Sequence, residues 1–180
     1  MRAVKGKPAV FLDRDGVLTK EKGYVVSPED MEIFPYVRDC IRQIREKGYF
    51  AIVVTNQGGI AKGLFTEKTL CEMNDRLIRQ TGVDAVYYCP HHPEGCVEGY
   101  AGECTCRKPS MGMLEAARKD FAVDMEMSWM VGDRASDILT GKNAGIRTIL
   151  LESGYGTAGL EFAVEPDYVF RDLRDVPGIL

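Results

Sequence analysis

The feature that most constrains the fold is a short apolar stretch near the N-terminus that ends abruptly in charge. Ala9–Leu12 reads as a buried strand, and Asp13 and Asp15 follow it directly. Open α/β sheets bind ligands beyond the carboxyl ends of their strands, so this position predicts a chemical site. Two carboxylates pointing the same way repel unless a cation separates them, and we expect Mg²⁺. The alternative is a charged turn with Asp15 and Gly16 as turn residues.

Later segments end in residues that suit the same site. The β-branched run 49–55 lacks alternation, as central parallel strands covered on both faces do, and it ends at Thr55. A strand over 129–131 leads into Asp133. Helical periodicity between the strands predicts an α/β fold with a doubly wound, Rossmann-like parallel sheet. The carboxyl edge of that sheet should gather Asp13, Thr55 and Asp133.

We expect residues 1–180 to form a single domain. A chain of 180 residues with 45% apolar residues can bury one sizeable core. Thr19–Pro35 is predicted to be a loop over the end of the first strand, and it is too short for a separate cap domain. Without a cap the site has an open mouth, and we expect a monomer.

A second cluster of functional residues is confined to the loop 89–106. Cys89, His91, Cys104 and Cys106 offer three thiolates and an imidazole, a set suited to tetrahedral Zn²⁺. Four protein ligands close the site, so the zinc would staple the loop and have a structural role. His92 and Cys96 are competing candidates, and the symmetry of the spacing favours His91. The alternative is a reduced loop with incidental cysteines.

Charge and hydropathy restrict the partners and the compartment. The 27 acidic residues outnumber the 23 basic ones, and the net charge of −4 disfavours a broad nucleic-acid-binding surface. No apolar run approaches the roughly 20 residues that span a bilayer, and residues 1–8 lack a signal-peptide segment. We therefore expect a cytoplasmic protein without nucleic-acid or membrane partners. Of its six cysteines, those clustered in the loop are expected to bind metal rather than form disulfides.

The motif Asp13-Arg14-Asp15-Gly16-Val17-Leu18 resembles the first signature of the haloacid dehalogenase-like phosphatases, and Thr55, Lys108 and Asp133 occupy the order of the remaining signatures. The resemblance implies that Asp13 attacks phosphorus to form an aspartyl phosphate, and that Asp15 acts as general acid and then base. Thr55 and Lys108 would stabilise the phosphoryl group. Mg²⁺ would be held by the Asp13 carboxylate, the Asp15 main-chain carbonyl and Asp133.

Asp137 follows the last signature at a distance of four residues. It would support the Mg²⁺ site from behind or orient Lys108. The alternative for Asp137 is a helix N-cap, because acidic side chains stabilise the first turn of a helix.

A closer resemblance covers nearly the whole chain. The D-glycero-D-manno-heptose 1,7-bisphosphate phosphatases share the motifs Phe11–Gly16, Gly23–Val25, Thr55–Ala61, Cys89–Pro93 and Cys104–Pro109. These enzymes supply heptose for lipopolysaccharide and related glycans. The sister group, the histidinol-phosphate phosphatases, shares the zinc loop and is more similar over Gly132–Asp137. The resemblance therefore implies a small phosphorylated metabolite, with a sugar bisphosphate first and histidinol phosphate as the alternative.

A sugar bisphosphate requires cations for its second phosphate. Lys62, Arg107 and Arg134 are the candidates, and Asn56 and Gln57 complete the predicted substrate-binding set. Lys62 stands where the family often has Arg, whose planar fork binds phosphate in a bidentate manner. Gly58 replaces a frequent Ser.

Two other classes of protein use parts of this pattern. A phospho-accepting receiver domain also places acidic residues, a Thr and a Lys at a sheet edge, but it has no acid/base residue like Asp15 and no zinc loop. A zinc-dependent nucleic-acid module is disfavoured by the acidic balance and by the absence of an aromatic-basic stripe. Rapid phosphate release without a stable phosphoprotein would separate an enzyme from a receiver.

Overall fold

The computed structural model describes residues 6–159 and 164–180. Its centre is a six-stranded, fully parallel sheet in the order β3-β2-β1-β4-β5-β6. The strands are β1 (Ala9–Leu12), β2 (Phe50–Asn56), β3 (Ala85–Cys89), β4 (Trp129–Gly132), β5 (Arg147–Leu151) and β6 (Tyr168–Phe170). The predicted doubly wound sheet is confirmed.

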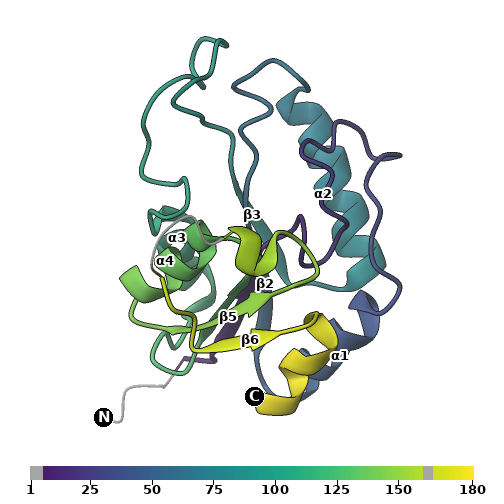
Figure 1. Ribbon diagram of the computed structural model, residues 1–180, viewed down its shortest axis with the longest axis vertical. Coiled ribbons are helices and arrows are strands. Elements are labelled where there is room, and N and C mark those ends of the chain that lie inside the picture. Colours follow the sequence, from purple (N-terminus) through teal and green to yellow (C-terminus); the bar gives the residue numbers. More distant parts are fainter. Residues whose placement is uncertain (1–5, 160–163) are drawn as a thin grey trace.

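Helices cover both faces of this sheet (Figure 1). The helices are α1 (Val37–Glu46), α2 (Glu67–Thr81), α3 (Gly112–Phe121) and α4 (Ala135–Asn143), with short 3-10 helices at Gly156–Gly159 and Leu173–Ile179. Helices α1 and α2 pack with the C-terminal 3-10 helix on one face, and α3 and α4 lie on the other. This arrangement is the doubly wound architecture, in which each parallel strand is buried on both sides.

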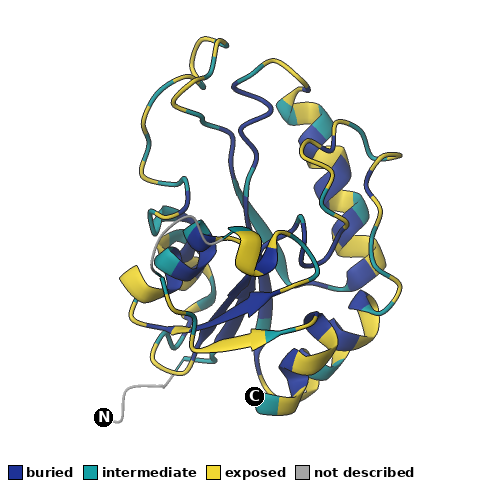
Figure 2. Cartoon of the chain, viewed as in Figure 1, coloured by how far each residue is buried: buried dark blue, intermediate teal, exposed yellow. Residues whose placement is uncertain are grey.

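Alternation along β1 divides the core into two layers. Val10 and Leu12 pack on the side of α1 and α2, whereas Ala9 and Phe11 pack on the side of α3, and all four residues are fully buried. Figure 2 shows buried strands at the centre of the molecule and exposed residues on the outer faces of the helices. A central strand with two buried faces reads as a continuous apolar run, which is why no alternation is visible in the sequence.

The topology brings two strand ends together at one point. The chain moves from β1 outward through β2 and β3, and then returns to place β4 on the other side of β1. Parallel sheets bind ligands at such a switch point, because the connections after the two central strands diverge and leave a crevice. In Figure 1 the connections after β2 and β3 extend beyond this edge of the sheet.

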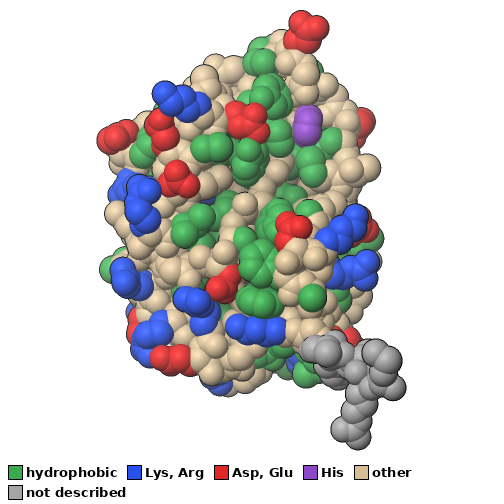
Figure 3. Space-filling view, turned by 180° about the vertical axis from the view of Figure 1, so that it is seen from behind, with side chains coloured by type: hydrophobic (Ala, Val, Ile, Leu, Met, Phe, Trp, Pro, Cys, Tyr) green, Lys and Arg blue, Asp and Glu red, His purple; other side chains and the backbone are tan. Residues whose placement is uncertain are grey.

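Charges are mixed on the outer surface. On the face shown in Figure 3, Lys and Arg side chains are interspersed with Asp and Glu and do not merge into one large basic patch. No helix in the described ranges combines the length and the apolar character needed to cross a membrane.

Candidate active site

A buried lysine lies at the centre of the candidate site. The Lys108 ammonium lies 2.8 Å from Asp13 Oδ1 and 2.6 Å from Asp137 Oδ1, and it donates a 2.9 Å hydrogen bond to the Val54 carbonyl. All three donors of the ammonium are therefore used. Although burial opposes its charge, the two carboxylates raise the pKa of Lys108 above its usual value. Lys108 is a fixed positive charge directly beside Asp13.

The end of β4 supplies two more carboxylates. Asp133 follows this strand, and Asp137 lies in the first turn of α4. Asp137 Oδ2 accepts hydrogen bonds from the main-chain N–H groups of Asp133, at 3.2 Å, and Arg134, at 3.1 Å, while its other oxygen contacts Lys108. The two interpretations of Asp137 are therefore compatible, because one carboxylate caps the helix and orients the lysine.

The acidic groups carry more negative charge than Lys108 can balance. Carboxylate oxygens of Asp13, Asp133 and Asp137 lie within 4.8 Å of one another, and Asp133 Oδ1 is buried without a hydrogen-bond partner. Burial and the neighbouring carboxylates raise the pKa of Asp133 to about 8. Burial, opposed by Lys108, raises the pKa of Asp13 to about 6. An oxygen-only site with excess negative charge fits a hard divalent cation such as Mg²⁺.

The approach of the first loop to this group requires a glycine. Gly16 has φ +85°, and a Cβ at this position would lie 2.3 Å from Asp133 Oδ2. A side chain would therefore clash with the carboxylate and strain the backbone at the same time. Gly16 allows the turn after β1 to pack directly against the acidic group.

Asp15 lies differently from the expectation for an extended strand. Strand β1 ends at Leu12, and Asp15 is not part of the group of three carboxylates. Its oxygens accept hydrogen bonds from Arg14 Nε (3.0 Å), Arg14 Nη2 (2.8 Å), Thr19 Oγ1 (3.0 Å) and Gln57 Nε2 (3.0 Å). Burial alone would raise the pKa of Asp15, but the Arg14 guanidinium and these hydrogen bonds hold that pKa below its usual value. Asp15 is therefore held as an anion beside Asp13.

The end of β2 provides a hydroxyl and two amides. Thr55 is buried, and its Oγ1 accepts a 2.8 Å hydrogen bond from Gln57 Nε2, which leaves the hydroxyl hydrogen free to donate. Asn56 pairs with the main chain of Lys108 through both side-chain atoms, at 3.0 and 3.2 Å. Asn56 and Gln57 are predicted to bind substrate. In the structure their side chains contact catalytic candidates, Asn56 the main chain of Lys108 and Gln57 the side chains of Thr55 and Asp15.

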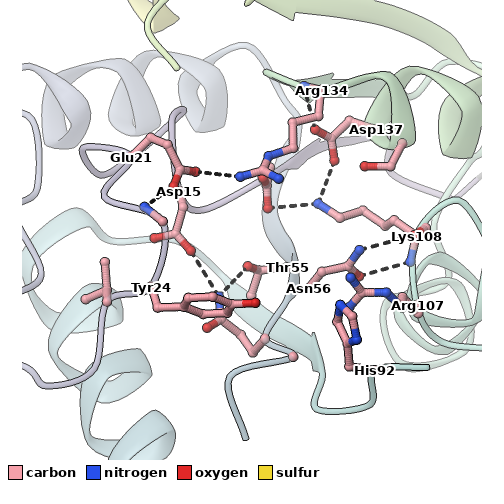
Figure 4. Close-up of a pocket in the computed structure, with 16 residues that line it drawn as sticks. Asp15, Glu21, Tyr24, Thr55, Asn56, His92, Arg107, Lys108, Arg134 and Asp137 are labelled. Atoms are coloured by element: carbon pink, nitrogen blue, oxygen red, sulfur yellow. Dashed lines mark hydrogen bonds and ion pairs between the residues drawn. The ribbon is translucent and has the colours of Figure 1, made fainter. Parts of the chain in front are cut away.

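A cavity opens above Asp13, and two of the three predicted cationic residues line it. Arg107 and Arg134 line it, together with Asn56 and Gln57, as Figure 4 shows for both arginines. Arg134 Nη2 donates to Glu21 Oε2 at 3.1 Å, and its guanidinium stacks 3.9 Å from the Tyr155 ring centroid. Lys62 does not line the cavity, although its ammonium lies 5.6 Å from the ring centroid of Tyr24, which does.

The loop between β3 and α3 brings the predicted zinc ligands together. Sulfur–sulfur distances are 3.5 Å for Cys89–Cys104, 3.0 Å for Cys89–Cys106 and 3.4 Å for Cys104–Cys106. The Nδ1 atom of His91 lies 3.7 Å from Cys89 Sγ and 3.4 Å from Cys106 Sγ. The edges of a tetrahedral zinc–thiolate site with ~2.3 Å bonds are roughly 3.7 Å long, so this group can hold a metal ion.

The competing candidates lie elsewhere. Cys96 is exposed and outside the metal-binding group. His92 lines the cavity, and its Nδ1 accepts a hydrogen bond from the main-chain N–H of Glu94. Burial, assisted by Arg107 and Lys62, lowers the pKa of His92.

The loop is also attached to the rest of the fold away from the metal-binding group. The Glu67 carboxylate, at the start of α2, accepts 2.7 Å hydrogen bonds from the hydroxyls of Tyr88 in β3 and Tyr100 in the loop. This contact connects the loop to a strand and to a helix.

Sequence reasoning missed several residues of the site. Glu21, Tyr24 and His92 line the cavity, and the buried Arg14 pairs with Asp15, but none of the four was predicted as part of the active site. The signal for Arg14 was its place between two functional carboxylates, where a buried cation is expected to pair. No periodicity marks Glu21 or Tyr24, because both lie in an irregular loop.

Comparisons with known proteins identify the family of this chain. A model of the HAD-hydrolase-like family matches residues 105–176. The D-glycero-beta-D-manno-heptose-1,7-bisphosphate 7-phosphatase of Salmonella typhi is 42% identical over 183 residues, covering 98% of this chain and 96% of the relative. The chain belongs to this phosphatase family. The relative of the same description from Escherichia coli K12 is 40% identical and covers 96% of this chain and 93% of its own.

A solved structure of the family has the same fold. The D,D-heptose 1,7-bisphosphate phosphatase from B. bronchiseptica, complexed with magnesium and phosphate, has a TM-score of 0.82 and is 32% identical. The match covers 96% of this chain and 97% of that one. The family assignment and the predicted haloacid dehalogenase-like fold are therefore confirmed, and the chain is a HAD-type phosphatase.

Proposed function

We propose that this protein removes the C7 phosphate from D-glycero-D-manno-heptose 1,7-bisphosphate. The observation that carries the proposal is the pairing of a Lys108-held Asp13 at the base of the cavity with Arg107 and Arg134 on its walls. Asp13 and Lys108, at the bottom of the cavity, suit the phosphate that reacts. The arginines on the cavity walls offer positive charge to the second phosphate of the sugar. The names of the 40–42% identical relatives support the same substrate.

Asp13 is the nucleophile in this proposal. Its carboxylate oxygen forms a bond to phosphorus while the bond from phosphorus to the sugar oxygen breaks, which gives an aspartyl phosphate. Thr55, through its free hydroxyl hydrogen, and Lys108 stabilise charge on the transferring oxygens. Both groups are buried and fixed by their neighbours, so little reorganisation is needed during the reaction.

Asp15 moves the protons. It delivers a proton to the leaving sugar oxygen, and it then removes a proton from the water that attacks the aspartyl phosphate and releases inorganic phosphate. Arg14 and Gln57 favour its anionic form, which suits the second step. For the first step Asp15 must gain a proton against these contacts.

Mg²⁺ would be held by Asp13, Asp133 and the main-chain carbonyl of Asp15. When bound, it supplies positive charge to the phosphoryl oxygens. The orphaned Asp133 oxygen and the raised pKa values of Asp13 and Asp133 support this assignment, since both indicate an unbalanced negative site. Asp137 would act from behind the site by orienting Lys108.

Zn²⁺ is the metal we assign to Cys89, His91, Cys104 and Cys106. Three sulfurs and one imidazole make a closed tetrahedral set, and its role is therefore structural. Thiolate ligands are preserved in reducing compartments, which supports a cytoplasmic protein. We also propose that residues 1–180 act as one monomeric domain, because one sheet edge carries the whole site.

Histidinol phosphate is the second candidate substrate. The Glu21 carboxylate lines the cavity and would attract the ammonium group of an amino alcohol. Two arginines on the cavity walls favour the bisphosphate instead.

The deciding experiment compares phosphate release from heptose 1,7-bisphosphate and histidinol phosphate with Mg²⁺ present. We expect kcat/KM for the bisphosphate to be higher by about a hundredfold or more, as expected when one substrate leaves buried charges unpaired. A preference for histidinol phosphate would support the alternative function, with the same reaction mechanism. Activity on neither compound would contradict the proposed substrate class.

A further inference from the structure

His92 is held firmly on the wall of the catalytic cavity, although the metal-binding group does not use it. Its main-chain N–H donates to the Tyr100 carbonyl at 3.2 Å. Its carbonyl accepts hydrogen bonds from the N–H groups of Gly95, at 3.0 Å, and Gly102, at 3.1 Å. These contacts fix the backbone of His92 inside the loop, so its side chain has a defined position.

The hydrogen bonding of the imidazole determines where its proton lies. The main-chain N–H of Glu94 donates to His92 Nδ1 at 3.1 Å, so Nδ1 must carry a lone pair. A neutral imidazole whose Nδ1 accepts carries its proton on Nε2. His92 therefore offers the cavity a neutral N–H donor.

Gly58 allows this ring to lie beside Arg107. A Cβ at Gly58 would be 2.8 Å from His92 Cδ2 and 3.3 Å from Arg107 Nη1. Both side chains therefore pack over the bare Cα of the same glycine, and Cδ2 is the ring atom bonded to Nε2. Figure 4 shows His92 and Arg107 together on one side of the cavity, opposite Glu21 and Asp15.

The two arginines of the cavity differ in how their charge is balanced. Arg134 forms an ion pair with Glu21 at 3.1 Å. Arg107 Nη1 donates to the His91 carbonyl at 3.1 Å, and none of the ion pairs within residues 6–159 and 164–180 includes Arg107. The wall formed by His92 and Arg107 thus presents donors and an unbalanced positive charge, whereas the opposite wall is neutralised.

We propose that His92 is a substrate-binding residue that donates from Nε2 to the distal phosphate of the sugar bisphosphate, beside Arg107. This inference rests on the proposed function and deepens it. It also gives the two arginines different roles. The distal phosphate binds at Arg107 and His92, and the Arg134–Glu21 pair faces the sugar hydroxyls. An ion pair offers both donors and acceptors, which suits hydroxyl groups better than a dianion.

The test compares His92→Leu, which keeps bulk without a donor, with His92→Gln, whose amide nitrogen can replace Nε2. Heptose 1,7-bisphosphate and heptose 7-phosphate are the two substrates. We expect the ratio of their kcat/KM values to fall by about tenfold or more in His92→Leu, mainly through KM of the bisphosphate, because a hydrogen bond to a charged group is lost. His92→Gln should restore most of the ratio.

Gly58→Ala is a second route to the same result that leaves the metal loop unchanged. Its Cβ would displace the imidazole by contact, so it should lower the same ratio. In a His92→Leu background Gly58→Ala should add much less, because the contact that it disturbs is already altered. The zinc content of every variant is measured, and His92→Leu should keep the wild-type metal content.

The outcomes separate this inference from the proposed function. If the wild-type protein prefers the bisphosphate and His92→Leu keeps that preference, the role of His92 is overturned and the function stands. A similar loss with both substrates would also overturn it, because that result indicates a structural role. If the wild-type protein does not prefer the bisphosphate to heptose 7-phosphate, the role of His92 is overturned, whereas the proposed function is decided separately by the comparison with histidinol phosphate. If His92→Leu loses its zinc, Gly58→Ala decides, and an unchanged ratio in that variant overturns the inference.

Discussion

The two candidate metal sites are built in opposite ways. Asp13, Lys108 and Asp133 come from segments far apart in the sequence. The pairing of β1 with β4 places Asp13 near Asp133, and contacts with the end of β2 hold Lys108 beside them. The Cys/His group comes from the two ends of one loop, and its three sulfurs lie 3.0–3.5 Å from one another. Buried hydrogen bonds and the Lys108 ammonium hold the carboxylate site together. The Cys/His group has no such cation among its members.

Because of this difference, the two sites should depend on their metal ions to different degrees. The carboxylate site is preorganised by the sheet, so loss of its metal should cost activity and leave the fold intact. The Cys/His site brings sulfurs together that gain little from one another, so its geometry depends on the metal. Arg107 and Lys108 follow the last Cys directly, and the Arg107 N–H donates to Cys104 Sγ at 3.4 Å. The metal loop therefore also supports the catalytic lysine.

The largest effect should come from Asp13→Asn. We expect kcat to fall by at least about a thousandfold, because the amide cannot attack phosphorus as the carboxylate does. The fold should persist, since Lys108 keeps its contacts with Asp137 and the Val54 carbonyl. Phosphate release and a thermal melt measure the two properties. Asp39→Asn, on the exposed face of α1, is the control that should keep full activity, and comparable activity in both variants would contradict the assignment of the nucleophile.

The next effect should come from Cys106→Ser, which breaks the second site. We expect loss of zinc and a decrease of more than about 3 kcal/mol in the free energy of unfolding, because metal binding contributes directly to folding. Urea unfolding and metal analysis provide the measurements. Cys96→Ser is the matched control, since Cys96 lies in the same loop outside the ligand group. Equal stability and metal content in the two variants would remove the contrast between the sites.

The smallest effect concerns pH and sharpens the contrast at the carboxylate site. The pKa values of Asp13, about 6, and Asp133, about 8, lie above the usual 3.8, so the folded protein without Mg²⁺ binds protons more tightly than the unfolded chain. The stability that this provides is complete below about pH 4 and is lost as the pH rises through 6 and 8. We expect the free energy of unfolding to decrease between pH 5 and pH 8.5 in magnesium-free buffer, because each carboxyl that stays protonated only in the folded state loses that advantage as the pH rises.

Asp133→Asn is the control for this pH dependence. Its unfolding free energy should vary less over the same range, because the most strongly shifted carboxylate is gone. Added Mg²⁺ should stabilise the wild-type protein more at pH 8.5 than at pH 5, since protons compete for the same oxygens. A wild-type profile that rises with pH would show that the carboxylates are balanced within the chain.

The strand ends were the most predictable part of the site. The apolar runs before Asp13 and Asp133, and the run that ends beside Thr55, became β1, β4 and β2 in one parallel sheet. Parallel strands must align their carboxyl ends, so a strand pattern locates these residues without any knowledge of the packing. The spacing of the Cys/His cluster was predictable for a similar reason, because short local spacing leaves few geometries.

Side chains on loops were less predictable. Strand β1 ends at Leu12, so the extended geometry assumed for Asp15 does not hold, and its carboxylate contacts Arg14 and Gln57. The pairing of Asn56 with the Lys108 backbone joins residues 52 positions apart, which no local pattern contains. Such contacts depend on how loops pack across the sheet edge.

By itself, the sequence determined the α/β class, the strand-end positions of Asp13, Thr55 and Asp133, and a metal-type spacing in the loop after β3. These properties follow from hydrophobic periodicity and short-range spacing, which are local. Only the tertiary structure decided which wall of the cavity carries balanced charge, that His92 lies in the cavity beside Arg107, and that Lys62 lies outside its lining. Those properties depend on distances between loops that meet only after the sheet has formed.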